Sequence, residues 1–166
     1  MYKNLFPNKI ISIKNKHIIN LTIIMISIIS IGLVYALFLS PADYIQGDSV
    51  RIMYVHVPAS FIALGCFLII GIVSILNLIF KIKFTPFIGK SIAPVGCIFA
   101  LISIATGSLW GKPTWGIWWV WDARLTSMLI LLFFYFAYIL IWKFVNIFEK
   151  ANKISSIIGI IGLFNL

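Results

Sequence analysis

The run VPASFIALGCFLIIGIVSILNLIF, residues 57–80, decides the fold because it holds no acidic or basic side chain. A helix needs about 20 consecutive apolar residues to cross the core of a bilayer. Three further runs, at 18–39, 91–110 and 125–142, meet or approach that length. The pattern predicts an all-α fold, a polytopic transmembrane helix bundle with four full spans.

A fifth apolar run begins at residue 157 and reaches residue 166. Ten residues cannot cross a membrane as a helix, so we expect this run to be a truncated fifth span. We therefore expect residues 1–166 to be one integral membrane domain that is incomplete at its C-terminus. The first run lacks a clear A-x-A cleavage site, which predicts a retained helix and not a signal peptide.

The composition agrees with a membrane protein. The chain is 62% hydrophobic and 10% charged, whereas soluble domains are about 45–50% apolar and about 25% charged. The thirteen Lys and Arg residues lie mostly in alternate connecting segments. One side receives Lys3, Lys9, Lys14, Lys16, Lys81, Lys83, Lys90, Lys143, Lys150 and Lys153.

The other side receives only Arg51, Lys112 and Arg124. Because basic loops stay on the inner side, we expect the N-terminus to face the cytoplasm or mitochondrial matrix. We expect a multi-pass protein of a bacterial inner membrane or of the mitochondrial inner membrane. The net charge of +9 lies on the side where anionic lipids gather. It therefore indicates a partner in the lipid bilayer and not in nucleic acid.

The stretch WGKPTWGIWWVWDAR, residues 110–124, holds five of the six tryptophans. Pro113 suits a helix start, which predicts a short surface helix in the outer loop 111–124. Such a helix would present Trp115, Trp118, Trp119 and Asp122 on one face, with Trp121 pointing elsewhere. The alternative is an interfacial aromatic belt. The concentration favours a platform for a flat aromatic ligand, with Asp122 as a polar orienter or the ion-pair partner of Arg124 or Lys112.

His56 lies in YVHVPAS, where Pro58 is expected to open the second span at its outer end. A neutral imidazole can bind iron, although a lone histidine near a helix end is often structural. Arg51 and Arg124 share its side of the membrane and could pair with carboxylates of a ligand. An aromatic floor, one imidazole and two cations together describe a haem site.

Several chemistries are excluded or disfavoured. Cys66 and Cys97 form no C-x-x-C motif, which argues against covalent haem attachment and dithiol chemistry. The chain has no Ser/His/Asp arrangement, no paired carboxylates and no phosphate-binding loop, so we expect no enzyme and no ATPase. A quinone-reactive respiratory subunit would need ionisable residues within its spans, and the four runs contain no acid or base.

Two stretches resemble a known family: WGKPTWGIWWVWDARLTS at 110–127 and GDSVRIMYVHVPAS at 47–60. Both are similar to the tryptophan-rich haem-handling membrane proteins of cytochrome c biogenesis, specifically the haem exporter protein C family. The resemblance covers about residues 40–142. It implies a six-helix membrane protein that holds haem b non-covalently at the outer face. It further implies delivery to a membrane-anchored haem chaperone, alongside ABC-type transporter subunits and a small membrane subunit.

The same resemblance assigns roles to residues. His56 corresponds to an axial ligand of the haem iron. The platform corresponds to Trp115, Trp118, Trp119, Trp121 and Asp122. The family's second axial histidine lies between its fifth and sixth helices, and this sequence contains no counterpart. We expect haem transport without catalysis; the alternative is a scaffold subunit of an ABC membrane complex whose tryptophan loop docks another protein.

Overall fold

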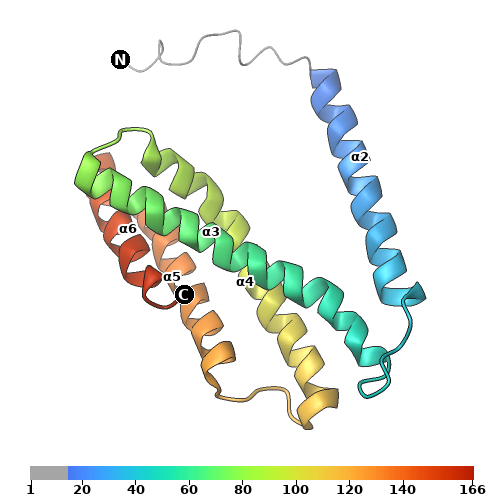
Figure 1. Ribbon diagram of the computed structural model, residues 1–166. Coiled ribbons are helices and arrows are strands. Elements are labelled where there is room, and N and C mark those ends of the chain that lie inside the picture. Colours follow the sequence, from blue (N-terminus) through green and yellow to red (C-terminus); the bar gives the residue numbers. More distant parts are fainter. Residues whose placement is uncertain (1–14) are drawn as a thin grey trace. The chain divides into compact units, whose positions relative to one another are not determined.

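The computed structural model describes residues 15–166, and their helices fall into two compact units (Figure 1). The first unit ends at Pro41, and the second comprises residues 42–166. Lys3, Lys9 and Lys14, which the charge pattern assigned to the inner side, lie outside the described residues.

The first unit contains one long helix, α2 (Asn15–Val34), continued by a π-helical turn, Tyr35–Leu39. The turn ends at Ser40, whose amide donates to the Tyr35 carbonyl at 2.9 Å. The segment His17–Leu39 is long and apolar enough to cross a membrane. It coincides with the predicted span 18–39.

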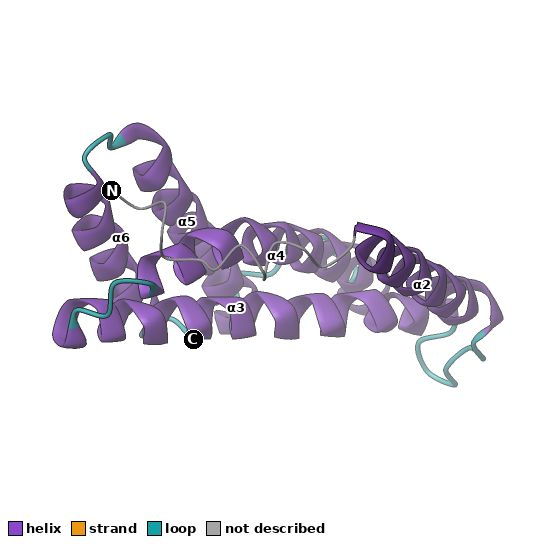
Figure 2. Ribbon diagram, turned by 90° about the horizontal axis from the view of Figure 1, so that it is seen from above, coloured by secondary structure: helices purple, strands orange, loops and turns teal. Residues whose placement is uncertain are grey.

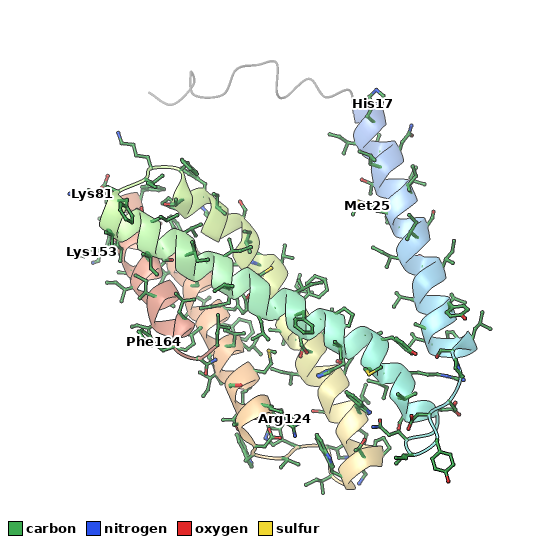
Figure 3. The ribbon with its side chains drawn as sticks, in the orientation of Figure 1. His17, Met25, Lys81, Arg124, Lys153 and Phe164 are labelled. Carbon is green, nitrogen blue, oxygen red and sulfur yellow. The ribbon has the colours of Figure 1, made fainter. Side chains whose placement is uncertain are left out.

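The second unit consists of four α-helices preceded by a short 3-10 helix, Asp48–Ile52. The helices are α3 (Met53–Phe80), α4 (Thr85–Trp115), α5 (Ala123–Phe144) and α6 (Phe148–Leu163). Helices α3 and α4 form the most extensive contact and lie alongside each other (Figure 2), while α6 packs on α3 and α5. Lys81 and Lys153 lie at one end of this unit and Arg124 at the other (Figure 3).

The predicted all-α fold is confirmed: within residues 15–166 there are helices and loops, and four helices could each span a membrane. The expectation that Pro58 opens the second span is wrong. Helix α3 begins at Met53, so Pro58 and His56 both lie within its first turns. Pro58 is the sixth residue of α3, so its missing N–H leaves the Tyr54 carbonyl without its helical donor, and the helix continues past this single lost bond.

The prediction of a short surface helix that starts at Pro113 is also wrong. Helix α4 continues through Pro113 to Trp115, and residues 116–122 are not helical. The stop is Gly116, which adopts a left-handed conformation (φ 79°) and donates its amide to the Lys112 carbonyl at 3.0 Å. Glycine takes this conformation at low cost, which explains why α4 ends at Gly116.

The fifth apolar run belongs to α6, which starts at Phe148 and not at residue 157. Its contact with α3 depends on small residues, since a Cβ on Gly159 would overlap the Ser74 hydroxyl. A buried polar link joins the same helices: the Asn77 side-chain amide donates to Asn152 at 2.7 Å and to Ser156 at 2.8 Å. Such links hold membrane helices together because lipid offers no alternative partner.

Small residues on α4 allow the close packing that forms the core. They recur every three or four positions as Gly89, Ala93, Gly96, Ala100, Ser103 and Gly107. Tyr135 of α5 packs against Gly96, and its hydroxyl donates to the Ala63 carbonyl of α3 at 2.6 Å. This stripe lets side chains of both neighbouring helices approach the α4 backbone: Tyr135 of α5 at Gly96 and His56 of α3 at Gly107.

Candidate binding cleft

A cleft of about 490 Å³ opens at the end of the second unit that carries Arg124. We call it the tryptophan cleft. Its walls come from α3, α4 and α5, from the segments that carry Gln46 and Trp119, and from the two residues Asn165 and Leu166 after α6. The lining residues are Gln46, His56, Ser60, Leu64, Ser103, Ile104, Gly107, Trp110, Gly111, Thr114, Trp115, Trp119, Arg124, Leu125, Ser127, Met128, Asn165 and Leu166. The volume lies within the range of about 300–1,000 Å³ typical of small-molecule sites.

His56 is half-buried in this cleft and is held by α4. Its Nδ1 lies 3.0 Å from the Ser103 carbonyl oxygen and 3.1 Å from the Thr106 hydroxyl oxygen. The carbonyl can only accept. The Thr106 hydroxyl donates to the Ile102 carbonyl at 2.6 Å, so its oxygen also accepts from the imidazole. Both contacts therefore make Nδ1 the protonated nitrogen.

The other ring nitrogen, Nε2, then carries the lone pair of the neutral imidazole. It makes no hydrogen bond with the part of the chain that the structure describes. A histidine whose Nδ1–H is held by backbone and hydroxyl oxygens is the usual arrangement of a metal-binding imidazole, because the hydrogen bond fixes the tautomer and the ring orientation.

The position of the His56 ring is set by its neighbours on α4. A Cβ on Gly107 would stand 3.0 Å from His56 Cε1, so any larger residue would require the ring to shift by a few tenths of an ångström. On another side the Trp110 ring makes an edge contact, with 5.8 Å between centroids. The Trp110 Nε1–H donates to the Gln46 side-chain oxygen at 2.8 Å, which fixes the indole.

The loop that delivers Gln46 is shaped by Asp43. One carboxylate oxygen accepts from the amides of Ile45 and Gln46 at 2.9 and 2.8 Å, and Gly47 closes the loop with positive φ. The hydrogen bond from the Gln46 amide is the main cause that lowers the pKa of Asp43 below its usual value. The ionised carboxylate thus orders the loop beside Trp110.

Arg124 and Trp115 form the opposite rim of the tryptophan cleft. The guanidinium carbon lies 5.6 Å from the Trp115 ring centroid, and Arg124 Nη2 donates to Asp122 at 2.8 Å. Asp122 also caps α5 by accepting from the Leu125 amide at 2.9 Å. That bond, followed by the contact with Arg124, lowers the pKa of Asp122. Because the Arg124 side chain remains 76% exposed, its charge can still meet a ligand carboxylate.

The predicted site residues are only partly brought together. His56, Trp115, Trp119 and Arg124 line the cleft, whereas Trp118, Trp121, Asp122 and Arg51 are absent from its lining. Trp118 and Trp121 are exposed, and Lys112 Nζ stands 5.9 Å from the Trp118 ring. Arg51 pairs with Asp48 at 3.2 Å.

Trp119 reaches the cleft from the non-helical segment 116–122. Its ring makes an edge contact with Trp121, with 5.5 Å between centroids. Its Nε1–H is buried and has no hydrogen-bond partner among the described residues. A buried donor without an acceptor is costly, so a ligand that supplied an acceptor here after a small movement of the ring would remove that cost.

The donor set limits which metal species fits. Residues 15–166 hold no group of three or more His, Cys, Asp or Glu side chains that could bind a metal ion. A bare Zn²⁺ or Ca²⁺ is held by about three or more protein donors. One free imidazole nitrogen therefore suits only a metal that arrives with its own equatorial ligands.

Comparison with known proteins decides the family. The family model for heme exporter protein C matches residues 2–166. The chain belongs to this family. It is 39% identical to heme exporter protein C of Escherichia coli K12 over 88% of this chain and 60% of the relative. It is 40% identical to the Paracoccus denitrificans protein over 79% of this chain and 54% of the relative.

The Haemophilus influenzae heme exporter protein C is also 40% identical, over 81% of this chain and 56% of the relative. The chain thus spans somewhat more than half the length of the relatives it matches. The resemblance predicted from the two motifs at 47–60 and 110–127 is confirmed at the level of the family.

Sequence reasoning missed several residues that this family member gathers around His56. They are Gln46, Ser60, Ser103, Thr106, Gly107 and Trp110. Ser103 and Gly107 belong to the small-residue stripe of α4, and its three- and four-residue spacing was the available signal. Gln46 had no signal, because its contact with Trp110 joins residues far apart in the chain.

Proposed function

We propose that this chain binds haem non-covalently in the tryptophan cleft, with His56 Nε2 as an axial ligand of the iron. The observation that carries the proposal is the pair of contacts at Nδ1, to the Ser103 carbonyl and the Thr106 hydroxyl. They leave Nε2 as the lone-pair nitrogen in a cleft walled by indoles. Trp110, Trp115 and Trp119 offer apolar and aromatic surface to a planar macrocycle.

We propose that Arg124 receives a haem propionate at the rim. The guanidinium is exposed and already lies over the Trp115 ring, an arrangement that leaves its N–H donors on one edge available. Asp122 would hold the guanidinium in place between ligands. Arg51 has no comparable place in the cleft lining and is a weaker candidate for this role.

We propose that the cleft faces the outer compartment and the lysine-rich end faces the cytoplasm or matrix. The bacterial relatives favour a bacterial inner membrane. Reporter fusions at residues 118 and 146 test this orientation, because the two sites lie in connecting segments on opposite ends of α5. The proposal expects an outer reporter at 118 and an inner one at 146; the reverse pattern would contradict it.

The biological role that we propose is transport of haem for cytochrome c maturation. The protein would hold haem at the outer face and pass it to a membrane-anchored haem chaperone, working with ABC-type transporter subunits and a small membrane subunit. This role rests on membership of the family together with the proposed site, and it assigns no catalytic step to the chain.

Haem titration of the purified chain tests the binding site. The wild type should develop a Soret band with one haem per chain. The double variant Trp115→Ala/Trp119→Ala, which removes two cleft walls, should bind at least tenfold more weakly. Trp118→Ala/Trp121→Ala removes the same number of indoles outside the cleft and should retain most of the affinity. Equal losses in the two double variants would reject the cleft as the binding site.

The second candidate function is a scaffold subunit of an ABC membrane complex. It is favoured by the exposure of Trp118 and Trp121, which are 56% and 75% accessible and lie outside the cleft. Exposed indoles are common anchors at protein interfaces. If the segment docks another protein, Trp118→Ala/Trp121→Ala should abolish co-purification of the transporter subunits while haem affinity is retained. Intact co-purification of the transporter subunits by this variant would contradict the scaffold function.

A further inference from the structure

A second, smaller cavity lies between α4 and α5 at the end of the unit opposite the tryptophan cleft. Its volume is about 200 Å³. We call it the basic cavity. It is lined by Lys90, Ala93, Pro94, Tyr138, Ile139, Trp142 and Lys143. None of these residues takes part in the candidate haem site.

Two exposed lysines, Lys90 and Lys143, line the basic cavity. Lys90 Nζ lies 5.2 Å from the ring centroid of Trp142, so the indole holds this charge at the edge of the apolar wall. Lys143 follows Trp142 directly, and its Nζ lies 5.8 Å from the Phe144 ring. The ion pairs between described side chains involve Arg51 and Arg124, not these two lysines. The positive charge here is therefore not neutralised by a described carboxylate.

The aliphatic part of the lining of the basic cavity comes from Ala93, Pro94 and Ile139. Pro94 has no N–H, so the carbonyl of Lys90, four residues earlier, lacks its usual helical donor. The cavity therefore combines two cations, one under-used carbonyl acceptor and a hydrocarbon wall. A ligand that suits all three has an anionic group, a hydroxyl and an apolar chain.

We propose that the basic cavity binds the phosphate headgroup of an anionic phospholipid, with Lys90 and Lys143 on the phosphate and Trp142 at the boundary between headgroup and chains. The location supports a lipid over a free anion. The cavity lies between two helices that could each span a membrane, near their lysine-rich ends. Basic pockets between membrane helices and tryptophans at helix ends both typify such lipid sites.

Native mass spectrometry of the detergent-purified full chain tests the proposal, with phosphatidylglycerol as the probe. Phosphatidylcholine and inorganic phosphate serve as separate arms. The wild type should retain one phosphatidylglycerol per chain, and phosphatidylcholine and phosphate should be retained far less. Lys90→Gln/Lys143→Gln should weaken retention of phosphatidylglycerol roughly 30-fold, the loss expected from two lysines at about five- to sixfold each.

Lys150→Gln/Lys153→Gln is the matched control. It removes two exposed lysines of α6 outside the cavity, with the same change in net charge. This control should retain the lipid like the wild type, and Lys90→Arg/Lys143→Arg should retain most of it. Equal weakening in the cavity and control variants would overturn the proposal, because the effect would then be one of general charge. Retention of inorganic phosphate as strong as that of phosphatidylglycerol would also overturn it, in favour of a free-anion site.

Discussion

The Nδ1 atom of His56 on α3 lies 3.0 Å from the backbone carbonyl oxygen of Ser103 on α4. A backbone carbonyl cannot be titrated or rotated away without moving the helix, so this contact fixes the tautomer of the imidazole more firmly than a side chain alone would. Nε2 of His56 therefore carries the lone pair, and its position depends on the packing of α3 against α4. The predictions below test that dependence and its consequences.

Thr106→Val should weaken haem binding without unfolding the chain. The hydroxyl is the second acceptor for the Nδ1–H of His56, at 3.1 Å, and the Ser103 carbonyl would remain. Loss of one outer partner of a metal-binding histidine typically costs about 10–100-fold in affinity, so we expect the lower end, about tenfold. Haem titration measures it. Thr22→Val, which removes a similar hydroxyl bond in α2, is the control and should bind haem normally.

Gly107→Ala should lower the affinity for haem without lowering the stability of the fold. The added Cβ would press on His56 Cε1 and shift the ring, so haem affinity should fall at least tenfold. Replacing a helical glycine by alanine otherwise stabilises a helix by about 0.5–1 kcal/mol. Gly65→Ala on α3, where nothing lies within 4 Å of the new Cβ, is the control. It should raise the thermal unfolding midpoint and leave affinity unchanged; normal haem binding by Gly107→Ala would show that the ring position is unimportant.

Arg124→Gln should weaken binding of haem but not of its dimethyl ester. The guanidinium is the exposed cation of the cleft rim, and only the free acid offers a carboxylate to it. We expect a loss of roughly 3- to 10-fold, because exposed ion pairs are worth about 0–1 kcal/mol and a charge-assisted hydrogen bond somewhat more. Lys112→Gln removes the same charge beside Trp118, outside the cleft, and should change neither affinity. An equal effect of Arg124→Gln on acid and ester would refute the propionate contact.

The thermal stability of the second unit should fall in acid because of Asp122 and Asp43. Hydrogen bonds to the carboxylates lower the pKa of both groups in the folded chain, first from the amide of Leu125 and of Gln46 respectively. Their stabilising effect is therefore complete above the unfolded-state pKa of about 3.9 and is lost as pH falls through the folded-state pKa. Unfolding midpoints measured from pH 7 down to about pH 2 follow this loss.

Asp122→Asn is the matched variant for this effect, because asparagine also caps helices well. It should unfold near the wild-type midpoint at pH 7 and lose less stability in acid. Asp43→Asn/Asp122→Asn should show the shallowest dependence. An acid profile identical to that of the wild type in both variants would mean that other groups govern it.

The helices of this protein follow from its apolar runs, but their ends do not. The runs at 57–80 and 125–142 lie inside α3 and α5, because a membrane requires that length of apolar helix. The predicted helix ends were wrong where a helix continues through polar residues or a proline, as at Pro58 and Pro113. Each proline removes one helical hydrogen bond, to the carbonyl four residues earlier, and each helix continues past that single loss.

The sequence predicted several residues of the site but not the contacts between them. His56, Trp115, Trp119 and Arg124 were identified from residue type and from their shared side of the membrane, and the fold brings them to one cleft. The partners of His56 depend on the register between α3 and α4, which periodicity alone does not give. The helical face proposed for Trp118 and Asp122 was lost because Gly116 ends α4 first.

The most direct test of the central claim is the axial ligation of haem in a His56→Gly variant of the chain. The absorption spectrum of bound haem reports whether an imidazole coordinates the iron. We predict that His56→Gly loses the imidazole-ligated spectrum, that added free imidazole restores it, and that the unfolding midpoint stays close to that of the wild type. A His56→Gly chain that keeps the wild-type haem spectrum without added imidazole would contradict the account.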